Sequence, residues 1–303
     1  MLQMAHTHDH SHEPNSYGFA FGFGILLNLA FVAIEGFYGW RANSLALLAD
    51  AGHNLSDVGG LVLAWVAYGA AKMRPNQRHT YGWRKASILA SFVNAVILLV
   101  AMGSLASEAI SRLGDPGTPN AQTIIIVAGV GVLINAVTAW LFMAGSRNDL
   151  NIRGAFLHMA ADAAVSLGVV ASGCLALWQS WVKLDPVVSL VIAVIIIFAT
   201  LSLFKRSLHM LFDGVPDDID LNAVRSVLLE IPGLKSLHDL HIWNLSTTET
   251  ALTVHLVLDE NIDVDAALRG ATNILIERFS IHHSTIQCES PRFATDCTLN
   301  VRH

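Results

Sequence analysis

The sequence is poor in charged residues, poor in cysteine and without an excess of basic residues, and each shortage excludes a class of protein. Only 14% of its 303 residues are charged and 53% are hydrophobic, which is too apolar for an ordinary water-soluble domain. The formal net charge of −6 leaves no basic surface for nucleic acid, so that partner is excluded. The three cysteines have no CxxC spacing, which argues against a disulfide framework and a cysteine zinc knuckle. An integral membrane protein is the default interpretation.

The amino terminus has neither a basic region nor a cleavage-type sequence, so we do not expect a removed signal peptide. Residues 1–16 instead contain HTHDHSH, in which four histidines alternate with other residues. Such a polar stretch is not expected to pack. We predict a His-rich cytoplasmic leader that captures metal weakly, and a tail with no role is the alternative.

Six apolar segments are long enough to cross a bilayer, whose hydrocarbon core of about 30 Å needs about 20 helical residues. They lie at approximately 17–39, 45–71, 86–110, 121–145, 154–181 and 186–204. The loops between them are short and rich in turn residues. The sequence therefore predicts a six-helix transmembrane domain over residues 17–206, in contact with membrane lipid.

Basic residues in the loops predict the orientation, because short cytoplasmic loops carry an excess of Lys and Arg. One side of the predicted bundle has only Arg41, Arg112 and Lys183. The other side has nine: Lys72, Arg74, Arg78, Arg84, Lys85, Arg147, Arg153, Lys205 and Arg206. This imbalance predicts that both termini are cytoplasmic.

Two of the apolar segments contain the same pair of ionisable residues. The second carries His53 and Asp57 and the fifth carries His158 and Asp162, so each pair lies at i and i+4 on one helix face. Ionisable groups at membrane depth are costly and usually functional. Two imidazoles and two carboxylates suit tetrahedral Zn²⁺. The pairs could also be structural hydrogen bonds between helices, but the repeated pattern favours a metal site.

The charges of this predicted site suggest how it would work. Two carboxylates neutralise a divalent cation, whereas the empty site would take up protons that the metal must displace. We therefore predict metal/proton antiport by alternating access. Asp50, one turn before His53, is a candidate for fixing that imidazole, whereas Glu35, Asn94 and Asn135 are expected to make structural hydrogen bonds.

The charge pattern changes after about residue 213, where period-2 alternation replaces long apolar runs. We predict a cytoplasmic α+β domain over residues 207–303 with the order α-β-β-α-β. Its elements are a helix near 219–231, strands at 237–246 and 250–258, a helix near 263–279 and a strand at 284–289. So small a domain buries a modest core, which favours a homodimer.

HNLSD in the second segment, HMAAD in the fifth, and HDLHIW and TIQCE in the tail resemble the cation diffusion facilitator family over essentially the whole chain. The likeness is greatest to the bacterial zinc, cobalt and cadmium resistance branch and to vertebrate zinc transporters. It implies a homodimeric metal/proton antiporter with a ferredoxin-like tail that binds regulatory zinc. By this resemblance His53, Asp57, His158 and Asp162 form the transport site, and the histidine at position 53 implies a preference for zinc.

For the tail, the resemblance implies one zinc cluster of His238, His255 and Glu289, with His241 and His282 near a second ion. Histidines on a cytosolic sheet are otherwise more often plain surface residues. Two further features follow from the likeness. Lys85 and Asp213 match positions that can form an ion pair between the membrane domain and the tail. The short loop between the fourth and fifth segments resembles that of prokaryotic members, so the likeness implies a bacterial inner membrane and a role in metal resistance.

Two other classes of protein place metal-binding residues in a membrane chain and are alternatives to a transporter. An intramembrane metalloprotease usually has an HExxH motif, which the sequence lacks, so we do not expect an enzyme. A membrane metal sensor that signals through its cytoplasmic zinc-binding domain is the remaining alternative. A sensor needs no metal site within the membrane, which distinguishes the two hypotheses.

Overall fold

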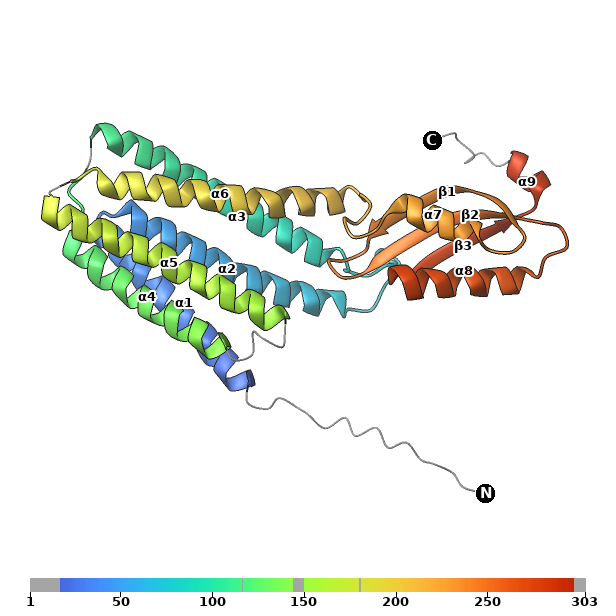
Figure 1. Ribbon diagram of the computed structural model, residues 1–303, viewed down its shortest axis with the longest axis horizontal. Helices are drawn as coiled ribbons and strands as arrows, with labels where there is room; N and C mark the ends of the chain where they lie inside the picture. Colours follow the sequence, from blue (N-terminus) through green and yellow to red (C-terminus); the bar gives the residue numbers. More distant parts are fainter. Residues whose placement is uncertain (1–16, 116, 144–149, 180, 297–303) are drawn as a thin grey trace, which may run out of the picture. The chain divides into compact units, whose positions relative to one another are not determined.

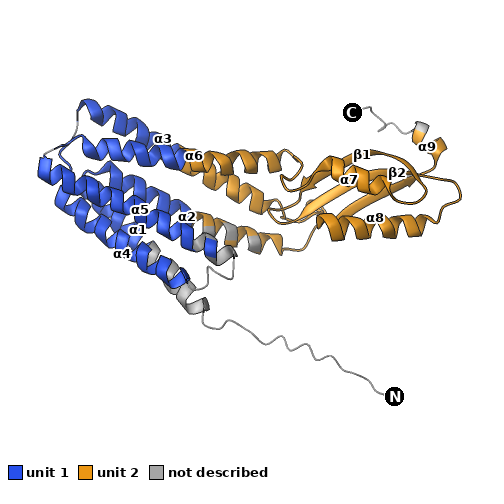
Figure 2. Cartoon of the chain, in the orientation of Figure 1, with its two compact units in different colours: residues 1–58, 100–197 blue, residues 59–99, 198–303 orange. Residues whose placement is uncertain are grey.

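The computed structural model describes residues 17–296 apart from 116, 144–149 and 180 (Figure 1). The predicted leader at residues 1–16 and Cys297 lie outside the described residues. The chain forms two compact units, one of residues 1–58 and 100–197 and one of residues 59–99 and 198–303 (Figure 2). The helices α2, α3 and α6 contribute residues to both units.

Long helices occupy all six of the predicted apolar segments. They are α1 Tyr17–Arg41, α2 Leu45–Ala71, α3 Ala86–Gly114, α4 Ala121–Met143, α5 Leu150–Gln179 and α6 Leu184–Leu211. Among the described residues, α3, α4, α6 and the Phe156–Gln179 part of α5 are long and apolar enough to cross a membrane. The protein therefore has a helical membrane domain, while the crossing of α1 and α2 stays a prediction.

In the first unit, α4 packs along α5 and also contacts α1 (Figure 1). Two glycines allow this close approach. A β-carbon on Gly131 of α4 would lie 2.7 Å from Cζ of Phe31 on α1, and one on Gly173 of α5 would lie 2.8 Å from Cγ1 of Ile125 on α4. Small residues at contacts are how membrane helices bring their backbones together.

Other faces of these helices are apolar and uncovered. Trp178 on α5 is 81% exposed, and Ile126 on α4 and Val100 on α3 are exposed to a similar degree. Water would disfavour so much apolar surface, whereas acyl chains are a suitable solvent for it. These faces are consistent with contact with lipid.

The first turn of α2 is capped by a side chain from α6. The Ser44 hydroxyl donates a hydrogen bond to the carboxylate of Asp185, and the Leu45 N–H donates a second bond of 2.8 Å to the same group. Both Ser44 and Asp185 are buried. The carboxylate satisfies N–H groups that a helix start leaves unpaired, so it fixes the start of the helix that carries His53 and Asp57.

The second unit contains the predicted α-β-β-α-β domain, followed by a short helix that the sequence did not predict. Its elements are α7 Leu221–Leu229, β1 Leu234–Asn244, β2 Thr250–Leu258, α8 Val264–Phe279, β3 His283–Glu289 and α9 Pro291–Asp296. The sheet order is β1-β2-β3, with β1 antiparallel and β3 parallel to β2. The predicted fold class is confirmed.

One face of this sheet packs against both α7 and α8. Leu252, Val254 and Leu256 of β2 lie in a common buried core with Leu228 of α7 and Leu275 of α8. Because side chains alternate along a strand, His255 points to the opposite face. The domain therefore separates an apolar core from a face that carries polar groups.

Candidate metal centres

The first candidate centre joins α2 and α5 within the first unit. His53 and Asp57 are one turn apart on α2, and His158 and Asp162 are one turn apart on α5, so each helix presents its pair on one face. The structure brings all four side chains together, as the sequence predicted. Asp57, His158 and Asp162 each offer a ligand atom within 4.8 Å of the others.

Four contacts link imidazole nitrogens to carboxylate oxygens in this group. His53 Nε2 lies 3.6 Å from Asp57 Oδ2 and 3.5 Å from Asp162 Oδ1. His158 Nε2 lies 3.2 Å from Asp57 Oδ2 and 3.6 Å from Asp162 Oδ2. Four ligands placed tetrahedrally about 2.0–2.2 Å from a zinc ion are roughly 3.3–3.6 Å apart. The four contacts have about this spacing, with His53 facing Asp162 Oδ1 and His158 facing Asp162 Oδ2. The residues whose ligand atoms all lie within 4.8 Å of one another are Asp57, His158 and Asp162, and His53 lies beside them.

Exposure differs sharply across the group. The Asp162 side chain is 4% exposed, whereas that of His158 is 43% exposed. The buried oxygens Asp57 Oδ2 and Asp162 Oδ2 have no hydrogen-bond partner among the described residues. Unsatisfied buried carboxylate oxygens are costly, and a cation would satisfy them. The open side near His158 gives such an ion access.

The neighbouring polar residues have other contacts. Asp50 accepts a 2.8 Å hydrogen bond from Ser166, and no hydrogen-bond partner reaches His53 Nδ1 in the described part of the chain. The proposed role of Asp50 in fixing the His53 ring is therefore not observed in this structure. Glu35 is buried and accepts a bond from Asn54, and Asn135 is buried on α4.

The second candidate centre lies on the tail sheet, in the second unit. His238 of β1 pairs in register with His255 of β2, and their rings are 4.9 Å apart. Glu289 ends β3, with Oε1 2.7 Å from His255 Nδ1 and Oε2 3.4 Å from His238 Nε2. These three residues form the second group of candidate ligands that the described residues contain. The family resemblance implied this set.

The donors of this tail group fit a metal ion. Glu289 is fully buried at its side chain, and its Oε2 faces the Nε2 of His238 at 3.4 Å without a hydrogen bond between them. Imidazole nitrogen and carboxylate oxygen are both ligands of zinc. Cys288 lies on the other face of β3 against the core, where burial raises the pKa of its thiol, so it is not part of the group.

Asp239 also belongs to this region, although the sequence analysis did not single it out. Its Oδ1 lies 2.9 Å from His241 Nε2 and its Oδ2 lies 3.7 Å from His255 Nε2. Asp239 has a left-handed backbone with φ 52°, at a β-bulge where the pairing moves from His238–His255 to His241–Thr253. The HDLH motif, which places Asp239 between His238 and His241, could have indicated this residue.

The remaining predicted tail ligands are not gathered into either group. His241 contacts Asp239, whereas His282 is exposed just before β3. The next residue, His283, pairs with Ala251, while Glu289 pairs with Val257 at the opposite end of the strand. Within the described residues, neither candidate group contains His241 or His282.

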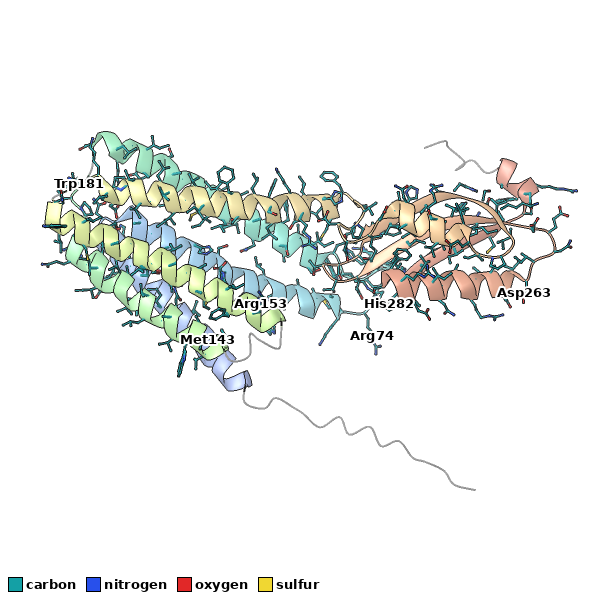
Figure 3. The ribbon with its side chains drawn as sticks, viewed as in Figure 1. Arg74, Met143, Arg153, Trp181, Asp263 and His282 are labelled. Carbon is teal, nitrogen blue, oxygen red and sulfur yellow. The ribbon has the colours of Figure 1, made fainter. Side chains whose placement is uncertain are left out.

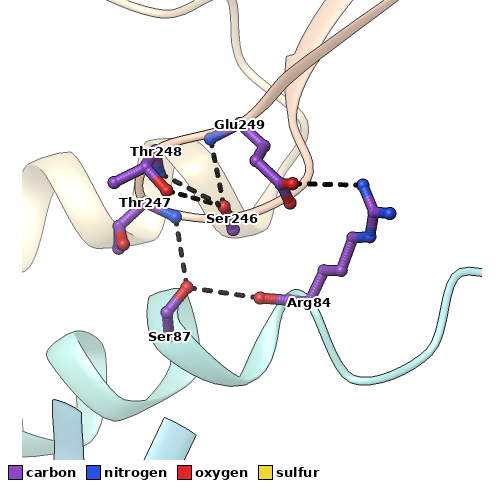
Figure 4. Close-up of polar contacts among 6 residues, drawn as sticks. All are labelled: Arg84, Ser87, Ser246, Thr247, Thr248 and Glu249. Carbon is purple, nitrogen blue, oxygen red and sulfur yellow. Dashed lines mark hydrogen bonds and ion pairs between the residues drawn. The ribbon is translucent and has the colours of Figure 1, made fainter. Parts of the chain in front are cut away.

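Polar contacts in the second unit link the segment before α3 to the turn between β1 and β2 (Figure 4). Arg84 Nη1 lies 3.3 Å from Glu249 Oε1, and the Thr247 N–H donates to Ser87 Oγ at 3.1 Å. Beside them, Lys85 Nζ lies 2.7 Å from Asp213 Oδ1. The pairing of Lys85 with Asp213, expected from the family resemblance, is confirmed.

Comparison with known proteins assigns both parts of the chain. Residues 23–212 match the family described as cation efflux transmembrane domain, and residues 216–291 match the cation efflux protein, cytoplasmic domain. The chain is 35% identical to "Zinc transporter ZitB" of Pectobacterium atrosepticum over 89% of this chain and 85% of that protein. It is 32% identical to the "Cadmium, cobalt and zinc/H(+)-K(+) antiporter" of Bacillus subtilis, over 88% and 86%.

A solved structure is also similar in sequence over part of the chain. It is described as the metal-bound C-terminal domain of the CzcD transporter, with 42% identity over 23% of this chain and 99% of that chain, and a TM-score of 0.23. The two family matches together account for most of the sequence, in the order that the structure shows. The chain belongs to the cation diffusion facilitator, or cation efflux, family of integral membrane transporters.

Proposed function

We propose that this protein exports divalent transition metal, with zinc as its main substrate, from the cytoplasm in exchange for protons. The transport site is the group formed by His53, Asp57, His158 and Asp162. The observation that carries the proposal is the set of four N-to-O spacings of 3.2–3.6 Å, two within a helix and two between α2 and α5. Those spacings fit four ligands of one tetrahedral ion. The names of the relatives, which include zinc, cadmium and cobalt, support the substrate class.

Charge explains why metal and proton exchange. The Asp57 and Asp162 carboxylates balance one divalent cation, so the loaded site is neutral at membrane depth. After the ion leaves, the same carboxylates and the imidazoles of His53 and His158 take up protons, because two bare carboxylates this close repel each other. A new ion must displace those protons. Opening the site to alternate sides then couples the two movements.

The direction of export follows from the proposed orientation. The loops on one side of the bundle carry nine basic residues and those on the other side carry three. This imbalance supports cytoplasmic termini, in a bacterial inner membrane. Figure 3 shows Arg153 and Met143 at one end of the first unit and Trp181 at the opposite end. Cytoplasmic metal therefore enters from the Arg153 end and leaves toward the Trp181 end.

The tail, proposed to span residues 207–303, supplies dimerisation and metal regulation. We propose that His238, His255 and Glu289 hold a zinc ion there, with Asp239 beside them, and that His241 and His282 serve a second ion. An ion that binds this folded domain stabilises it. A metal sensor would need only this tail, so the converging ligands on α2 and α5 favour transport.

The proposal is tested in inverted vesicles that contain a zinc indicator and a pH indicator. Wild-type protein should take up zinc and release protons at the same time, whereas His158→Ala and Asp162→Asn should do neither. Cys174→Ala on α5, an exposed residue outside the site, is the matched control and should retain both fluxes. Proton flux that survives intact in the site variants would contradict the assignment. Competition by Cd²⁺, Co²⁺ and Ni²⁺ in the same assay defines the range of metals.

A further inference from the structure

A second pair of carboxyl groups lies buried beside the transport site, and the exchange mechanism above does not use it. Glu35 of α1 and Asp50 of α2 are both completely inaccessible to solvent. Asn54 Nδ2 donates a 3.3 Å hydrogen bond to Glu35 Oε2, and Ser166 Oγ of α5 donates a 2.8 Å bond to Asp50 Oδ2. Each carboxyl group therefore has one oxygen satisfied by a neighbouring helix.

The other two carboxyl oxygens, Glu35 Oε1 and Asp50 Oδ1, are buried and have no donor among the described residues. Asn54, the donor to Glu35, follows Asp50 by about one turn on α2, so the two carboxyl groups lie at the same part of that helix. An ionised carboxylate only accepts hydrogen bonds, so two of them cannot bond together. One proton between the groups would satisfy both oxygens and remove the repulsion between them.

Other charges near the pair do not replace that proton. In the described chain, no Lys or Arg forms an ion pair with either group. The titratable groups near Asp50 are His53, about one turn later on α2, and Asp162, about one turn before Ser166 on α5. Asp50 also has the shorter hydrogen bond of the two. Glu35 is therefore the member that carries the proton, and it donates to Asp50.

The pair occupies a particular position along the helices. Asp50 precedes His53 by about one helical turn on α2, and Ser166 follows Asp162 by about one turn on α5. The Asp50–Ser166 bond therefore lies just beyond the transport site, toward the Leu45 end of α2. In the proposed orientation this is the outer side, from which protons enter.

We infer that Glu35 is a proton-binding site on the outer side of the transport site and supplies protons to it through Asp50. This inference rests on the proposed metal/proton exchange. When the metal has left, the O–H bond of Glu35 breaks as one forms on Asp50, and Asp50 passes that proton to the emptied site. A proton from the outer side then restores Glu35, so each cycle moves one proton inward along this route.

Glu35→Gln tests the inference, because an amide mimics the protonated acid and still donates to Asp50 but cannot exchange its hydrogen in this way. Zinc affinity of the full-length variant should stay within about threefold of wild type, because the ligands are unchanged. The number of protons exchanged per zinc ion should fall by one, and the dependence of zinc flux on outer pH should weaken. The matched control is Glu108→Gln, an exposed Glu on α3 paired with Arg112, which should behave as wild type.

An infrared measurement keeps the test independent of transport. Zinc-free wild-type protein should show the carbonyl band of a protonated carboxylic acid. The band should be missing in Glu35→Gln, retained in Glu108→Gln and shifted in Asp50→Asn. An unchanged band in Glu35→Gln, or an unchanged proton number per zinc ion, would overturn the inference and leave zinc/proton exchange standing. Wild-type vesicles that move zinc without protons would instead contradict the proposed function itself.

Discussion

The carboxylate of Glu289, at the end of β3, lies 2.7 Å from His255 Nδ1 on the neighbouring strand. This contact joins two strands that are parallel and far apart in sequence, and it completes a group of buried donors with His238. The arrangement predicts that tail stability depends on metal.

Zinc in excess should stabilise β1 and β2, because an ion that binds only the folded state adds about 2.7 kcal/mol at 100 times its dissociation constant. Glu289→Gln should abolish most of this gain, since it removes the charged ligand. Hydrogen exchange of residues 234–258 in the full-length protein, with zinc or with a chelator, measures the difference. His283→Ala, at the other end of β3, should keep the gain. Equal stabilisation in Glu289→Gln would contradict the tail site.

Asp239 should tune that site without being required for the fold. Asp239→Asn keeps a residue type that tolerates the left-handed backbone at φ 52°, but it removes the negative charge beside His241 and His255. We expect tail zinc affinity to fall by about 10- to 100-fold, as is typical when a supporting group is lost. Calorimetric titration measures this change. Asp259→Asn, which affects an exposed pair with Lys235, should change the affinity little.

Gly131 should be sensitive to the smallest possible substitution. Gly131→Ala places a β-carbon 2.7 Å from Phe31, so we expect it to cost about 1–3 kcal/mol of unfolding free energy, as overpacking does. Gly129 on the same helix has no atom within 4 Å of such a β-carbon. Gly129→Ala should therefore be neutral or slightly stabilising. Unfolding in denaturant distinguishes them, and equal effects would show that the approach of α1 and α4 is not tight.

The ion pair of Arg84 with Glu249 should be weak. Both side chains are more than a third exposed, and exposed pairs contribute about 0.2–1 kcal/mol. A double-mutant cycle with Arg84→Gln and Glu249→Gln should give a coupling energy in that range, and it should fall as salt screens the charges. Coupling of several kcal/mol that does not depend on salt would show a rigid connection. If the Arg84–Glu249 pair is as weak as predicted, it would allow the turn between β1 and β2 to separate from the segment before α3.

Much of the fold could be predicted from local sequence. Apolar length predicted α1 to α6, and period-2 alternation predicted β2, because both signals arise from which face of an element is buried. The four proposed transport ligands were predictable for a related reason: HxxxD on two apolar helices places two pairs of ionisable residues at membrane depth, where such groups are costly and usually functional. Their spacing in the structure is as expected for one shared ion.

Other features had no local signal. The bond from Ser44 to Asp185 joins residues 141 positions apart, so only the folded bundle reveals that α6 caps α2. Asp239 was missed because simple alternation cannot detect the extra residue of a β-bulge, which puts both His238 and His241 on the same face of the sheet. The hydrogen bond that Glu35 accepts from Asn54 joins α1 to α2, so the segment that contains Glu35 gives no local sign of it.

The proposal that α2 and α5 share one ion is tested most directly by X-ray absorption at the zinc edge. The sample is full-length protein whose tail ligands are removed by His238→Ala and Glu289→Gln, so that bound zinc reports on the membrane site. We predict four nitrogen and oxygen neighbours at about 2.0–2.1 Å, two of them imidazole, and no sulfur. Adding His158→Ala should remove one imidazole signal or the bound zinc itself. A zinc spectrum that His158→Ala and Asp57→Asn leave unchanged would contradict the site.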